Sequence, residues 1–78
     1  MEQATIEYSI TDEKIAVIRF NRVEKMNAMT FEMFVELDKV IYHVLNQTEK
    51  EVRVIVLTHN GKHFTAGLDI QSAGMIMN

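Results

Sequence analysis

The feature that most constrains the fold is an almost continuously apolar run, VRVIVLT at residues 52–58, which follows a long amphipathic segment. A short valine-rich run of this kind predicts a central strand that is covered on both faces of a sheet. The segment before it predicts a helix that begins after an N-cap at Thr30. Its apolar residues recur every three or four positions, as on one face of a helix: Met33, Phe34, Leu37, Val40, Ile41, Val44 and Leu45.

Two further strands are predicted before the helix. The sequence IEYSI at 6–10 alternates apolar and polar residues, and IAVIRF at 15–20 is rich in β-branched residues. The polar turn TDEK at 11–14 joins them, so we expect an antiparallel pair. The order strand, strand, helix, strand indicates an α/β fold with a crossover unit. One helix leaves a face and an edge of such a sheet open, so we expect these 78 residues to be part of a larger assembly or domain.

Composition excludes several classes of function. The net charge of −3 is not the basic footprint of a nucleic-acid-binding protein. The absence of cysteine rules out disulfides and thiolate metal sites. No apolar run is long enough to cross a bilayer, so we expect no membrane partner. We interpret His43, His59 and His63 as surface residues and expect no metal.

Two irregular segments, 21–29 and 61–70, flank the helix and the apolar strand. Loops at the end of a parallel strand are where α/β sheets bind ligands. A simpler interpretation remains open, in which both are plain connectors. In that interpretation Gly67 supplies an unusual dihedral angle, and Asp69 caps a short helix predicted at the start of IQSAGMIM, residues 70–77.

Two motifs carry a resemblance to a known family. FNRVEKMNAM at 20–29 and VRVIVLTHNGKHFTAGLDI at 52–70, in this order and separation, resemble the N-terminal portion of the crotonase (enoyl-CoA hydratase/isomerase) superfamily. The loop FTAGLDI is most similar to the dienoyl-CoA isomerase branch, because hydratases more often have alanine where this chain has Leu68. Val23 stands where the family usually has proline, and we expect this to loosen the first loop.

The resemblance implies a fold and a site. The fold would be the N-terminal ββαβ part of a crotonase-like (ClpP/crotonase spiral) fold, with residues 1–78 as a single fragment of that domain. The Leu68 N–H would be the first of two backbone donors to a thioester oxygen, and Asp69 would turn its side chain away. The second donor, a glycine amide, and the acid/base carboxylates would lie beyond Asn78. The thioester and the CoA nucleotide would contact Ala66, Gly67, Leu68, Asp69 and Ile70, and CoA would border Lys25, Met26 and Ala28, with Lys25 near a phosphate.

The implied activity is that of an acyl-CoA isomerase, which shifts the double bonds of a dienoyl-CoA through an enolate. We expect the 78-residue chain to be inactive alone. Two alternatives stay open: an enoyl-CoA hydratase of fatty-acid β-oxidation, and a non-catalytic CoA-ester-binding or interaction module. No separate cofactor is implied, because coenzyme A is part of the substrate. We also expect a homo-oligomer inside the cell, in the cytoplasm of a bacterium or in a mitochondrion or peroxisome of a eukaryote.

Overall fold

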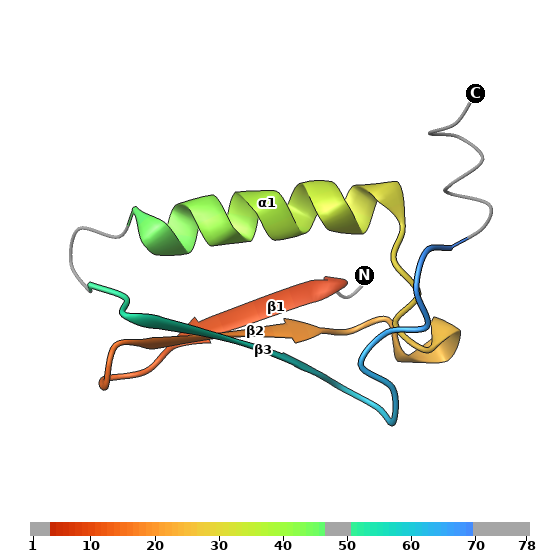
Figure 1. Ribbon diagram of the computed structural model, residues 1–78, viewed down its shortest axis with the longest axis horizontal. Coiled ribbons are helices and arrows are strands. Elements are labelled where there is room, and N and C mark those ends of the chain that lie inside the picture. Colours follow the sequence, from red (N-terminus) through yellow and green to blue (C-terminus); the bar gives the residue numbers. More distant parts are fainter. Residues whose placement is uncertain (1–3, 47–50, 70–78) are drawn as a thin grey trace.

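The computed structural model describes residues 4–46 and 51–69, which form a three-stranded sheet with one helix across one face (Figure 1). The elements are the strands β1 (Ile6–Ile10), β2 (Ile15–Phe20) and β3 (Val54–His59), the short 3-10 helix η1 (Val23–Lys25) and the helix α1 (Phe31–Leu45). This order confirms the predicted ββαβ arrangement. The helix predicted after Asp69, and Ile70 with it, lie outside the described residues.

The strand pairing brings the two irregular segments together. β1 is antiparallel to β2, with Ile6 opposite Phe20, as the predicted hairpin requires. β2 is parallel to β3, with Phe20 beside His59, so β2, α1 and β3 form the predicted crossover. Because parallel strands end at the same edge of a sheet, the chain leaves β2 and β3 at one end of the molecule. Segments 21–29 and 60–69 therefore lie side by side there (Figure 1).

Within the described residues, β3 does not have the central position that its apolar run predicts. The strand order β1-β2-β3 places β2 in the centre and β3 at an edge. Val54 and Val56 are 52% and 41% exposed, because α1 covers only one face and no other described element lies on the opposite face (Figure 1). An apolar run indicates that a strand needs cover, but it does not show whether the same chain provides it.

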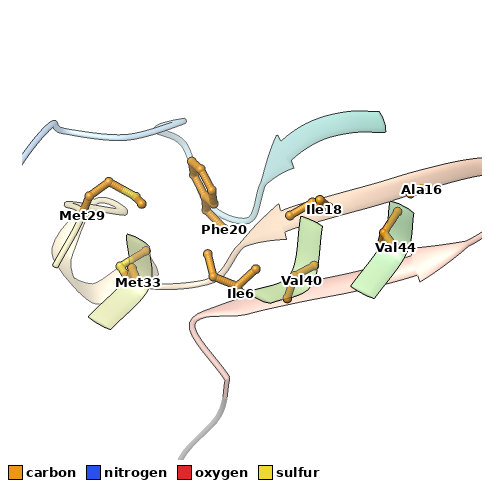
Figure 2. Packing of buried hydrophobic residues seen from close by; sticks show 8 residues of the cluster. All are labelled: Ile6, Ala16, Ile18, Phe20, Met29, Met33, Val40 and Val44. Atoms are coloured by element: carbon orange, nitrogen blue, oxygen red, sulfur yellow. The ribbon is translucent and has the colours of Figure 1, made fainter. Parts of the chain in front are cut away.

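The hydrophobic core lies between α1 and the covered face of the sheet (Figure 2). Alternate residues of β2 point to the helix, and Ala16 and Ile18 are fully buried. The remaining buried apolar residues come from β1, the end of β2, the following loop and α1: Ile6, Phe20, Met29, Met33, Val40 and Val44.

The start of α1 is as predicted, but its apolar face is narrower. The Thr30 hydroxyl accepts the N–H of Met33 at 3.1 Å, which confirms the cap. Two members of the predicted stripe, Phe34 and Leu45, are 44% and 61% exposed. A helix on a small three-stranded sheet buries only the part of its stripe that the sheet can reach.

Candidate functional site

The site is built from two loops that are held together by backbone hydrogen bonds. The Met29 N–H donates to the Gly67 carbonyl at 2.7 Å, and the Asp69 N–H donates to the Met29 carbonyl at 2.9 Å. These two bonds form a parallel bridge between Met29 and Leu68. Earlier in both loops, the Ala66 N–H donates to the Met26 carbonyl at 3.0 Å. Residues 26–29 and 66–69 therefore run beside each other in a fixed register.

A buried asparagine supports this pair of loops. Asn27 is 1% exposed, and its Nδ2 donates to the carbonyls of Asn60 and His63 at 2.9 and 2.8 Å. Its Oδ1 accepts the Arg22 N–H at 2.7 Å. The Asn27 backbone is left-handed (φ 56°), a conformation that asparagine adopts more readily than most residues. One side chain thus fixes both the first loop and the turn after β3.

An ion pair between Arg22 and Asp69 also links the two loops. The Arg22 Nη1 donates to the Ala28 carbonyl at 2.9 Å and to the Asp69 Oδ2 at 3.0 Å. The side chains of Arg22 and Asp69 are only 18% and 20% exposed, so solvent screens this pair less than a surface pair. The carboxylate of Asp69 turns to the neighbouring loop. Its suggested role as a cap concerns a segment outside the described residues.

In the part of the second loop that runs beside the first, residues 66–69, every backbone amide but one is engaged. The amides of Ala66 and Asp69 bind carbonyls of the first loop, and the Gly67 N–H donates to the Thr65 hydroxyl at 3.1 Å. The Leu68 N–H makes no hydrogen bond with any residue in 4–46 or 51–69. A parallel bridge uses the groups on either side of its central residue, so the N–H of Leu68 faces away from Met29.

Gly67 leaves space beside that free amide. Its φ of 97° lies where side chains are strained, and a Cβ built there would meet no atom of the described residues within 4 Å. Gly61, at φ 77°, differs in this respect, because its Cβ would lie 2.9 Å from a methyl group of Val23. Gly61 is therefore required for packing, and Gly67 lies open to an approaching ligand.

An apolar hollow of about 360 Å³ adjoins Leu68. Its walls come from both layers and from the loop, and include Phe20, Phe34, Leu37, Leu57, Phe64 and Leu68. The ring centroids of Phe20 and Phe64, which both line it, are 5.0 Å apart. Among the described residues that line it, none is an aspartate or glutamate. This part of the chain can hold an apolar group beside the Leu68 amide, but it brings no carboxylate to it.

Comparisons with known proteins identify the family. The sequence model of the family described as enoyl-CoA hydratase/isomerase matches residues 11–77. The chain belongs to this family. A solved structure from Legionella pneumophila, described as an enoyl-CoA hydratase/isomerase (crotonase), superimposes on 99% of the chain with a TM-score of 0.82 and 35% identity, and the match covers 29% of that structure. The predicted crotonase-like fold is confirmed.

Two curated relatives show the range of activities in this family. A probable enoyl-CoA hydratase of Mycobacterium tuberculosis is 41% identical over 63 residues, which are 81% of this chain and 21% of the relative. The peroxisomal Delta(3,5)-Delta(2,4)-dienoyl-CoA isomerase of Arabidopsis thaliana is 32% identical over 66 residues, or 85% of this chain and 23% of the relative. The chain thus spans about a fifth of the length of these crotonase relatives.

Four of the five predicted thioester-binding residues lie together in this crotonase loop. Ala66, Gly67, Leu68 and Asp69 follow one another beside the first loop, and Ile70 is outside the described residues. Only Leu68 among these four has an uncommitted amide. Their role in binding stays a prediction, and the geometry makes Leu68 the candidate donor.

The predicted CoA-binding residues are on the adjacent loop. The amides of Lys25, Met26 and Ala28 donate to the carbonyls of Arg22, Val23 and Lys25 at 2.9–3.1 Å. These three residues have no spare N–H, so they could meet a nucleotide only through carbonyl oxygens and side chains. The exposed side chain of Lys25 is the cationic group among them. This assignment stays a prediction.

The pattern in the sequence did not reveal the residues that hold the crotonase loops together. Arg22 and Asn27 are in the family motif FNRVEKMNAM at 20–29, but the motif did not predict a structural role for either residue. The partners Arg22 and Asp69 are 47 positions apart, so no local pattern links them. The interpretation of the histidines as surface residues holds only in part for His59, because its ring is half-buried and packs 5.8 Å from that of Phe64.

The described residues hold neither a cluster of metal ligands nor a membrane-spanning helix. In residues 4–46 and 51–69, no group of three or more histidine, cysteine, aspartate or glutamate side chains could hold a metal ion. No helix in the described part of the chain is long and apolar enough to cross a membrane.

Proposed function

We propose that this chain forms part of the acyl-CoA site of an enoyl-CoA hydratase/isomerase, and that the Leu68 N–H is one of the donors to the thioester oxygen. The observation that carries the proposal is the set of hydrogen bonds in the loop. The amides of Ala66, Gly67 and Asp69, on both sides of Leu68, are bonded, and that of Leu68 is unbonded among the described residues. A fixed, unpaired amide can stabilise a developing enolate without breaking a bond in the protein.

The surroundings of the amide support a thioester as its ligand. Ala66 and Gly67 are small, and the space beside Gly67 is open, so a carbonyl can approach the backbone closely. The apolar hollow next to Leu68 offers a place for an acyl group. The exposed Lys25 on the neighbouring loop would attract a phosphate of CoA.

Two reactions of the family fit this half of a site. Hydration of a 2-enoyl-CoA and isomerisation of a 3,5-dienoyl-CoA both pass through an enolate at the thioester. Hydration is favoured by the 41% identity with the probable hydratase. Isomerisation is the second candidate, because Leu68 stands where hydratases of this family more often have alanine and because a dienoyl-CoA isomerase is also a relative.

The test is a parallel assay of the protein that carries this chain. Loss of the enoyl-thioester absorbance would report hydration, and gain of the conjugated 2,4-dienoyl absorbance would report isomerisation. We expect turnover of at least one substrate, and the ratio of the two kcat/KM values assigns the activity. Binding of a non-reactive acyl-CoA without turnover of either substrate would support the non-catalytic module and contradict our proposal.

A further inference from the structure

We propose that the ion pair between Arg22 and Asp69 is a positioning device that aims the Leu68 N–H at its ligand. This inference rests on the proposed function, because it assigns to two residues the task of holding that donor. In this proposal neither side chain contacts the thioester itself. Each would act through the backbone of the loop.

The peptide unit between Gly67 and Leu68 explains how aiming works. In a trans peptide the C=O and N–H point in opposite directions. No peptide bond among residues 51–69 is cis, and the Gly67 carbonyl accepts the Met29 N–H at 2.7 Å. The Leu68 N–H must then point directly away from Met29. The direction of the donor is therefore set by the bridge between the loops, and whatever holds the bridge holds the donor.

The side chain of Arg22 binds both loops next to that bridge. Its Nη1 binds the carbonyl of Ala28, the residue before Met29, and the carboxylate of Asp69, the residue after Leu68. The backbone of Arg22 is in turn fixed by the buried side chain of Asn27. A single guanidinium nitrogen thus links the residues adjacent to the bridge on both loops.

The same chain offers a longer and more exposed ion pair, at the opposite end of the sheet, as a control. Lys14 Nζ and Glu51 Oε2 are 3.8 Å apart, and these side chains are 45% and 70% exposed. Lys14 precedes β2 and Glu51 precedes β3, away from the loops that follow these strands. Loss of Lys14 removes one charge contact of Glu51, which also lies 3.8 Å from Arg53 Nη2, and leaves the bridge intact.

The experiment compares Asp69→Asn, Arg22→Gln and Arg22→Lys with the control Lys14→Gln in the protein that carries this chain. Asp69→Asn keeps the size of the side chain and an acceptor oxygen, so it is the variant chosen to preserve the fold, which circular dichroism checks. We expect kcat to fall about tenfold or more for Asp69→Asn and Arg22→Gln, because a small misplacement of a catalytic group is costly. KM should change by less than about threefold, since the lost contact is made in the transition state.

Arg22→Lys should recover part of the lost kcat, because it keeps the charge but not the planar fork. A second measurement does not need turnover. Hydrogen exchange at the amides of Met29 and Asp69, which form the bridge, should become faster in all three variants and stay unchanged in Lys14→Gln. A purely structural ion pair would lower the melting temperature without a selective effect on these two amides.

The outcomes separate this inference from the proposed function. Folded Asp69→Asn and Arg22→Gln proteins with normal kcat, or with only a raised KM, would overturn the positioning role. If the wild-type protein turned over no acyl-CoA, the proposed function would fail. Hydrogen exchange at the amides of Met29 and Asp69 would then be the remaining test of whether the ion pair holds the bridge. Unchanged exchange in the variants would overturn the inference, and selectively faster exchange would support it.

Discussion

At the scale of single residues, the site depends on one backbone group. Leu68 is 58% exposed, and its amide is free because the bridge to Met29 uses the groups of Gly67 and Asp69. The resemblance in the sequence predicted Leu68 as the donor, but no pattern could show why its amide is free. That depends on hydrogen bonds between residues about 40 positions apart, which only the folded chain brings together.

Leu68→Pro tests this donor in the protein that carries the chain. Proline removes the N–H of residue 68, and neither bond of the bridge uses that N–H, so we expect the fold to persist. Loss of one oxyanion donor should lower kcat by roughly 100-fold or more. Leu68→Ala is the matched control and should keep much of the activity, because it keeps the amide.

Circular dichroism must show both Leu68 variants folded before rates are compared, since proline also restricts Gly67. Near-normal kcat in a folded Leu68→Pro protein would show that another group binds the thioester oxygen.

At the scale of elements, periodicity predicted what each segment is, but not what covers it. The alternation in β1 and the three- and four-residue spacing in α1 are local, so both elements and the Thr30 cap were predictable. The position of β3 at the edge of the sheet and the exposure of Phe34 depend on neighbours in space. An apolar pattern alone does not contain that information.

The N-cap of α1 gives a prediction at this scale. Thr30→Ala removes the acceptor of the Met33 N–H and should lower the free energy of unfolding by about 1 kcal/mol. Urea or thermal denaturation would measure it. Thr30→Ser keeps a hydroxyl acceptor and should stay close to wild type. Equal losses in both variants would mean that the cap is not what Thr30 contributes.

At the scale of the whole molecule, one face of the sheet is left uncovered by residues 4–46 and 51–69. Val17 and Val56 are register partners and point away from α1, because their neighbours Ala16 and Ile18 point toward it. Val54 lies on the same face, and β3 also leaves an open edge. Exposed apolar strands of this kind promote association with another surface.

We therefore expect the polypeptide of residues 1–78 to self-associate, and Val56→Lys to weaken this association without unfolding the chain. Light scattering or sedimentation over a range of concentrations would measure it. Val35→Lys is the comparison, since Val35 is similarly exposed, at 39%, but lies on the helix. A stable monomer at high concentration, or an effect of Val35→Lys alone, would contradict the placement of the interface on the sheet.

The polypeptide of residues 1–78 should not turn over 2-enoyl-CoA or 3,5-dienoyl-CoA by itself. Proton transfer needs a positioned acid or base, and no carboxylate is among the described residues that line the hollow beside Leu68. The measurement is a sensitive assay against a heat-inactivated sample. Conversion above that background would show that this segment carries acid/base chemistry of its own.

The bridge between Met29 and Leu68 also bears on which length changes this protein could accept in evolution. Surface loops usually accept insertions and deletions with little cost. Here an indel of one residue that shifted the pairing by one position would place residue 67 or 69 opposite Met29. The amide that now faces outward would then turn inward, and a neighbour's amide would replace it. Substitutions at position 68 can alter the shape of the site while the donor remains, whereas an odd change in length between the two loops would exchange the donor itself.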